Sequence, residues 1–228
     1  MAGRTGRRSP LCLAVAASAA VSLVLLTGCR TPNSMLRQRG FVALQQDNPV
    51  AAYEQFAKAV AQDPTDWKAQ YHLGKLLLER DQAVDAQLAL EQARALRPDD
   101  PETPRIIDAL AEAHYQQQRY ESLHGLLAEA TETFGQSHDY LRQGEYLTRI
   151  GEIDGAKLAY LKAVEFADPA DVKPHVQLAL FYEQIGNRDM ALDVWQKAYH
   201  MAPGNAEVVA KLRQYGVVPG PTVGAPPP

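Results

Sequence analysis

The chain has 228 residues and a formal net charge of −4, with 46% hydrophobic, 22% charged and only 7% aromatic residues. Its richness in Ala, Leu, Glu and Gln is typical of helical proteins, and its length suffices for one domain with a sizeable core. The lack of a basic surplus argues against a nucleic-acid-binding protein, so we expect no nucleic-acid partner.

The first 28 residues have the parts of a secretory signal. Arg4, Arg7 and Arg8 precede an almost unbroken apolar run from Leu11 to Leu26, and no acidic residue lies among them. As a helix rising ~1.5 Å per residue the run spans about 24 Å, which is shorter than the ~30 Å hydrocarbon core of a bilayer. We therefore expect a cleaved signal and not a permanent membrane-spanning helix.

The end of this segment, Leu26-Thr27-Gly28-Cys29, resembles the lipobox of bacterial lipoproteins. The resemblance implies cleavage after residue 28, acylation of Cys29 and a short tether over residues 29–33. An ordinary cleaved signal with an incidental cysteine is the alternative. Under the sorting rule of enteric bacteria, Arg30 favours the periplasmic face of the outer membrane if the organism has two membranes.

Removing residues 1–28 changes the charge and the cysteine count. The loss takes three of the 23 basic residues and none of the 27 acidic residues, so the mature chain is formally −7. Cys12 leaves with the signal and Cys29 becomes the only cysteine. An internal disulfide is then impossible, so packing alone must stabilise the exported protein.

A spaced pattern recurs through the rest of the chain: a small residue, a bulky residue four later, Ala three after that and Pro five further on. Its clearest copies are Ala52, Phe56, Ala59, Pro64; Ala86, Leu90, Ala93, Pro98; and Ala191, Trp195, Ala198, Pro203. The anchors Ala52, Ala86, Leu123, Ala156 and Ala191 are separated by steps of 34, 37, 33 and 35 residues. Such a period predicts a solenoid of helical pairs, whose extended surface suits binding better than catalysis.

The same residues, with Leu73-Gly74 and Leu178-Ala179 in the preceding helices, resemble the tetratricopeptide repeat (TPR) family. The resemblance implies an all-α, right-handed TPR solenoid of about five helix-turn-helix repeats within residues 34–216. The repeats fall at about 33–66, 67–100, 104–137, 137–170 and 172–205, and a capping helix falls at 206–215.

Two parts of the chain depart from this regular pattern. Repeat three has Leu123 where Ala is usual and Gly135 where Pro is usual, which predicts a local bend. The tail, residues 217–228, holds five prolines and two glycines and is predicted to be disordered. A proline ligand for an aromatic groove is the alternative reading of the tail.

The sequence contains none of the common motifs of catalytic, phosphate-binding or metal-binding sites. No two of the six histidines lie three or four residues apart, and no phosphate loop, nucleophile elbow or His-Glu-x-x-His motif occurs. We therefore expect a protein that is not an enzyme and needs no cofactor or metal.

In the TPR family, positions 2, 5, 9, 12 and 13 of each first helix line a groove. Carried over to this chain, they include the candidate peptide-binding residues Arg37, Phe41, Lys68, Tyr71, Lys75, Arg105, Glu112, Tyr115, Glu145 and Arg149. The first six combine cations with aromatic rings, which suits an extended peptide carrying acidic groups. The alternative is that these are ordinary polar residues in contact with water.

These features predict a membrane-anchored TPR lipoprotein that acts as a protein–protein interaction scaffold or adaptor in cell-envelope assembly. Its architecture is similar to that of the TPR lipoproteins that pilot secretins in type IV pilus assembly, and to those that adapt envelope enzymes. The expected partners are proteins or peptides, together with the membrane that holds the lipid. An exported carrier of a small molecule or glycan, an enzyme accessory subunit, and self-association through the repeats are the alternatives.

Overall fold

The computed structural model describes residues 32–97, 102–220 and 223. The predicted signal peptide, the predicted lipidation site Cys29 and most of the proline-rich tail lie outside these residues. The described residues form eleven helices and no strand, which confirms the prediction of an all-α fold. None of these helices is long and apolar enough to cross a membrane.

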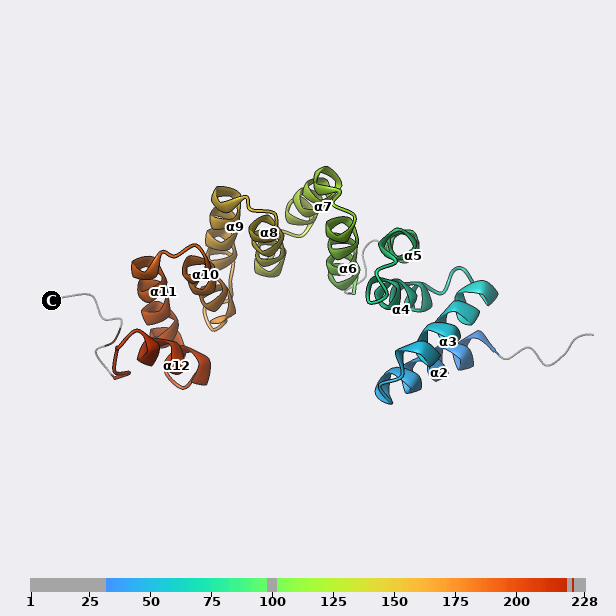
Figure 1. The fold of residues 1–228 in the computed structure, drawn as a ribbon, viewed down its shortest axis with the longest axis horizontal. Helices are drawn as coiled ribbons and strands as arrows, with labels where there is room; N and C mark the ends of the chain where they lie inside the picture. Colours follow the sequence, from blue (N-terminus) through green and yellow to red (C-terminus); the bar gives the residue numbers. More distant parts are fainter. Residues whose placement is uncertain (1–31, 98–101, 221–222, 224–228) are drawn as a thin grey trace, which may run out of the picture. The chain divides into compact units, whose positions relative to one another are not determined.

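The chain divides into two compact units, at Asp63 and Pro64. The first unit contains one helix pair, α2 (Asn33–Gln45) and α3 (Pro49–Gln62). The second unit contains four pairs in succession and a final helix (Figure 1). Its helices are α4 (Trp67–Leu78), α5 (Ala83–Leu96), α6 (Thr103–Gln116), α7 (Tyr120–Thr133), α8 (Ser137–Arg149), α9 (Ile153–Glu165), α10 (Lys173–Gln184), α11 (Arg188–Met201) and α12 (Ala206–Gln214).

Each first helix is followed by a residue in the left-handed region. These residues are Asp47, Asp81, Gln118, Gly151 and Gly186, with φ between 54° and 85°. They recur with the same steps of 34, 37, 33 and 35 residues that separate the sequence anchors. A left-handed residue after a helix satisfies its last carbonyl groups and turns the chain, so the period of the sequence is the period of this turn.

Close packing within a pair depends on a small residue in the first helix. A Cβ atom added to Gly40, Gly74 or Gly144 would lie within 3.0 Å of Phe56, Leu90 or Tyr160 respectively. The glycines therefore let a large side chain of the second helix fill the space between two closely crossing helices.

The third repeat packs differently because Leu123 replaces the small anchor of α7. Leu123 is fully buried, and α7 packs less closely against α6 than α5 does against α4. Helix α6 instead makes its more extensive packing with α5 of the preceding pair. The departure that the sequence shows at this repeat is thus a looser helix pair.

The final helix covers the apolar end of the last pair. Val208 and Leu212 of α12 are fully buried in the same cluster as Trp195 and Tyr182. Asn205 caps the helix by accepting hydrogen bonds from the N–H groups of Glu207 and Val208. This is the packing that a terminal repeat needs to keep its apolar side away from water.

Candidate functional site

The first helices of the second unit form a continuous surface, here called the first-helix face. Helices α4, α6, α8 and α10 contact one another in that order. Eight predicted binding residues belong to these helices: Lys68, Tyr71, Lys75, Arg105, Glu112, Tyr115, Glu145 and Arg149. Arg37 and Phe41 belong to α2 in the first unit, where Phe41 packs edge-on against Phe56 with ring centroids 5.4 Å apart. Their grouping with the other residues stays a prediction.

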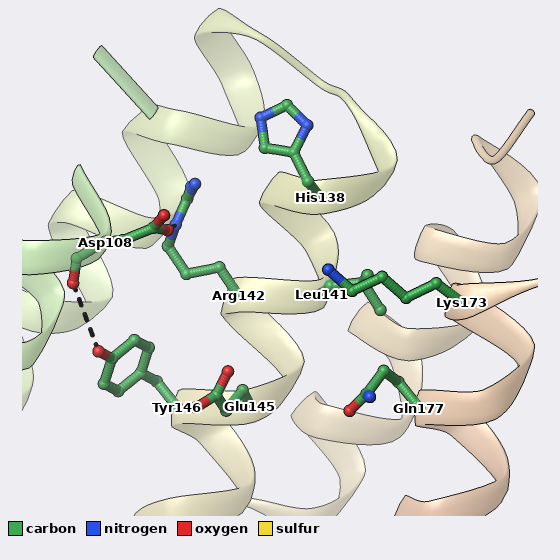
Figure 2. A pocket seen from close by; sticks show the side chains of 8 residues that line it. All are labelled: Asp108, His138, Leu141, Arg142, Glu145, Tyr146, Lys173 and Gln177. Carbon is green, nitrogen blue, oxygen red and sulfur yellow. Dashed lines mark hydrogen bonds and ion pairs between the residues drawn. The ribbon is translucent and has the colours of Figure 1, made fainter. Parts of the chain in front are cut away.

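A pocket of 410 Å³ lies on this face between α6, α8 and α10 (Figure 2). It is lined by Asp108, His138, Leu141, Arg142, Glu145, Tyr146, Lys173 and Gln177. Figure 2 shows Lys173 reaching from α10 toward Leu141 of α8. Of the ten candidate peptide-binding residues, Glu145 lines this pocket. The same groove positions of the repeats also include Asp108, His138, Leu141 and Lys173 of its lining.

Arg142 forms one wall of the pocket and joins α8 to α6. Its side chain is only 5% exposed, and its Nη1 donates to Asp139 Oδ1 at 2.9 Å. The guanidinium also pairs with Asp108 and donates to the carbonyl oxygen of Pro104 at 3.3 Å. Asp139 is fully buried and accepts a second hydrogen bond from the N–H of Gln136. Both side chains are therefore buried and hydrogen-bonded, as the partners of a buried ion pair must be.

Arg142 and Asp139 lie outside the groove positions of the repeat, so the sequence pattern did not predict them. Comparing the repeats with one another could nevertheless have indicated the buried ion pair. In the other repeats of the second unit, the position of Asp139 is occupied by Ala69, Ile106 and Pro174, all of them buried. A charged residue at a position that is otherwise apolar indicates a buried polar partner.

Three of the predicted residues, Glu112, Tyr115 and Arg149, form a second group with Tyr146. Arg149 pairs with Glu112 at 2.6 Å, and its guanidinium lies 3.8 Å from the ring centroid of Tyr115. The hydroxyl of Tyr146 donates to the same carboxylate at 3.1 Å. These side chains satisfy one another across α6 and α8, so they shape the face more than they offer free groups to a ligand.

The pKa values of this group reflect burial and mutual contact. Burial acts to raise the pKa of Glu112, but the hydrogen bond and charge of Arg149 outweigh it and the net pKa is lowered. Burial and the neighbouring Glu112 both raise the pKa of Tyr146. Glu112 is therefore ionised and Tyr146 neutral at physiological pH.

A second pocket of 330 Å³ continues the surface along α8 and α10. It is lined by Glu145, Thr148, Arg149, Tyr160, Gln177, Leu180, Phe181 and Gln184. Glu145 and Gln177 line both pockets. The two hollows thus adjoin along the face, with the exposed carboxylate of Glu145 between them.

The α4 end of the face is basic. Lys68 and Lys75 are both exposed, and Lys75 Nζ lies 5.9 Å from the ring centroid of Tyr71. Burial, together with the charges of Lys75 and Lys68, lowers the pKa of His72 to about 4. Arg105 lies near Tyr71 but pairs with Glu102 at 2.6 Å. Positive potential is therefore concentrated at the two lysines, and Arg105 is partly neutralised.

Groups that bind metals are not assembled in the described part of the chain. It contains no cluster of three His, Cys, Asp or Glu side chains with the geometry to hold an ion. His124 lies 2.9 Å from Glu152, and His138 lies 3.3 Å from Asp139. Each of these histidines faces one carboxylate and takes part in contacts between or within helices.

Comparison with known proteins supports the fold. Residues 43–105 match the family model described as tetratricopeptide repeat. The structure resembles that of the MamA protein, with a TM-score of 0.57, 21% identity, and coverage of 83% of this chain and 98% of that chain. It also resembles TTC0263, a thermophilic TPR protein of Thermus thermophilus, with a TM-score of 0.55, 22% identity, and coverage of 80% and 98%.

A third similar structure is that of YrrB, described as a TPR protein with an unusual peptide-binding site. The TM-score is 0.51 at 17% identity, and the match covers 78% of this chain and 90% of that chain. No curated protein matches the sequence. These likenesses show that the helix pairs are arranged as in a TPR solenoid, as the sequence predicted.

Proposed function

We propose that this protein is a membrane-anchored lipoprotein that binds an extended segment of a partner protein on its first-helix face, as an adaptor in assembly at the cell envelope. The observation that carries the binding role is the pair of adjoining pockets, of 410 and 330 Å³, which share Glu145 and Gln177. Both lie on the first helices, where successive repeats present a continuous surface.

The size of the face suits a peptide. Four neighbouring helices at spacings of about 8–10 Å span roughly 24–30 Å. An extended chain advances about 3.3 Å per residue, so about eight residues would reach from α4 to α10. The peptide-binding site named for YrrB supports this class of partner by analogy of fold.

The charges on the face indicate what the segment carries. Lys68 and Lys75 attract acidic groups at the α4 end, whereas the pockets expose both the carboxylate of Glu145 and the ammonium of Lys173. This pattern is complemented by a segment that has acidic groups at one end and both an acidic and a basic group at the other.

Binding of the acidic end can be tested by reversing charge at the α4 end of the face. Lys75→Glu combined with Arg105→Glu should reduce cross-linking of the partner in cells by about tenfold, because each reversal replaces an attraction by a repulsion. The free energy of unfolding should change by less than about 1 kcal/mol, because both side chains are exposed. A photo-activated cross-linker placed at Lys68, measured by mass spectrometry, reports the capture.

The matched control reverses two exposed charges on second helices or the cap, Lys157→Glu with Arg213→Glu. This variant should capture the partner as the wild type does. Equal capture by the Lys75/Arg105 variant would reject the acidic-peptide assignment. Recovery of a bound metabolite, with no cross-linked protein, would favour the alternative that the pocket carries a small molecule, since 410 Å³ lies within the range of ligand sites.

The membrane anchor rests on the lipobox-like sequence and on the position of α2. This helix begins at Asn33, so three residues, and thus four Cα-to-Cα steps, separate it from Cys29. At about 3.6 Å per step these four steps reach at most ~15 Å, which keeps the first helix pair near the lipid surface.

Acylation at Cys29 predicts a processing defect in Cys29→Ser. The variant should remain at the size of the precursor and take up no palmitate analogue, because serine offers no thiol for the lipid. Cys12→Ser is the matched control, since it also removes a cysteine but leaves the lipobox-like sequence intact. Normal processing of the Cys29→Ser chain, seen on a gel of metabolically labelled cells, would reject the anchor.

A further inference from the structure

The first helix pair leaves one apolar side uncovered in the described structure. A pocket of 300 Å³ between α2 and α3 is lined by Met35, Gln38, Arg39, Val42, Ala43, Gln46, Ala51 and Gln55, here called the end face. Met35 is 48% exposed and Val42 is 38% exposed. Only uncharged side chains accompany the single arginine in this lining.

The same positions are buried in later repeats of the second unit. Ile106 and Ala113, which correspond to Met35 and Val42, are fully buried. In the last repeat, Phe181 corresponds to Val42 and packs against Tyr160 of the preceding pair, with ring centroids 5.1 Å apart. This side of a repeat is therefore the side on which the preceding repeat packs, and no described helix precedes α2.

Arg39 shows that the end face is not built to receive another helix pair. Its position is occupied in later repeats by Leu73, Leu110, Gln143 and Leu178, none of them charged, and Leu110 and Leu178 are buried. An arginine held in a dry helix interface without an acid would be strongly unfavourable. At a boundary between water and an apolar phase, however, its stem covers apolar groups while the guanidinium binds phosphate.

The first helix is basic, whereas the chain that follows it is acidic. Residues 30–46 contain Arg30, Arg37 and Arg39 and no acidic residue. Residues 47–228 contain 17 basic residues and all 27 acidic residues, a formal charge of −10. An anionic surface would attract the first helix and repel the rest of the chain.

A second copy of the chain fits the end face less well. Helix α12, at the other end of the repeats, carries Lys211 and Arg213 in its last turn. Lys211 pairs with Glu183 at 2.5 Å, but Arg213 is exposed and would repel Arg39. An anionic lipid surface supplies both the phosphates for Arg39 and the apolar layer for Met35 and Val42.

We infer that the end face docks on a bilayer containing anionic lipid, with Met35 and Val42 at the level of the acyl boundary and Arg39 at the phosphates. The predicted acylation site lies only four residues before α2, so both signals act at the same end. Two weak membrane signals give firm attachment where one is marginal. This surface goes beyond the proposed function, since the first-helix face of the second unit takes no part in it.

The experiment uses the chain from residue 30, which contains every described helix and lacks both the signal and Cys29. Flotation with vesicles of phosphatidylcholine containing about 30 mol% phosphatidylglycerol should show binding that weakens as salt is raised. The variant Met35→Gln, Arg39→Glu, Val42→Gln should bind at least about tenfold more weakly, because it loses the apolar contacts and reverses one charge near the surface.

The matched control makes the same kinds of change on other exposed positions, Val84→Gln, Leu88→Gln and Arg213→Glu, and should bind like the parent. Equal binding to vesicles of phosphatidylcholine alone, or unchanged binding of the end-face variant, would overturn the inference. A dimer in light scattering that the end-face variant abolishes, without vesicle binding, would assign the face to a second copy. Partner capture through Lys75 is measured separately, so failure here leaves the proposed function standing.

Discussion

Trp195→Ala should lower the free energy of unfolding of the last helix pair and its cap by about 4 kcal/mol, because replacing a fully buried aromatic side chain by alanine leaves a large cavity. Trp195 is 0% exposed and belongs to the cluster formed by α8 to α12. Its Nε1–H donates to Glu183 Oε1 at 2.9 Å, and Lys211 of α12 lies 5.7 Å from its ring centroid. One side chain thus ties α10, α11 and α12 together.

Hydrogen exchange resolved to α10, α11 and α12 is the measurement, because repeats can open locally without unfolding of the whole chain. Trp195→Phe should cost less, since it keeps most of the buried area and loses mainly the hydrogen bond to Glu183. Met190→Ala on the same helix is the control. Met190 is 41% exposed, and its loss should change stability by no more than about 0.5 kcal/mol. A loss below about 1 kcal/mol for Trp195→Ala would contradict the assigned packing.

The repeats could be predicted from the sequence because each helix pair is specified by local features. A small residue in the first helix faces a bulky one in the second, as Gly74 faces Leu90 and Gly144 faces Tyr160. The turn residue between the helices recurs at the same spacing, even where it is Asp47 or Gln118 and not glycine. Both features act within one repeat, so one period of sequence contains the information.

The functional surface could be predicted only in part, because its contacts join neighbouring repeats. The groove positions assigned Glu112, Tyr115 and Arg149 to first helices, and the structure has them in α6 and α8. They did not reveal that Arg149 binds Glu112 across 37 residues, since a repeat pattern fixes which side a residue faces but not its partner. The exposure of the end face could not be predicted from the repeat pattern either. Met35 and Val42 occupy ordinary core positions, and only their place in the first repeat leaves them exposed.

Arg142→Ala should lower the free energy of unfolding by about 3–5 kcal/mol, because it removes one partner of a buried ion pair and leaves Asp139 with only the half-exposed His138 beside it. Asp139 would keep its hydrogen bond from the Gln136 N–H but lose the guanidinium that neutralises it in a fully buried position. The link from α8 to Asp108 and Pro104 of α6 would also be lost. Urea unfolding of the mature chain measures the effect.

Arg105→Ala is the matched control, since Arg105 also pairs with a carboxylate but has a side chain that is 68% exposed. Its loss should cost less than about 1 kcal/mol. The double variant Arg142→Met, Asp139→Asn should be more stable than the sum of its single variants predicts, because no buried charge is left without a partner. Additive effects would show that the pair is not coupled. Coupling of about 2 kcal/mol would instead identify the Arg142–Asp139 pair as the contact that fixes α8 against α6, and with it one wall of the pocket.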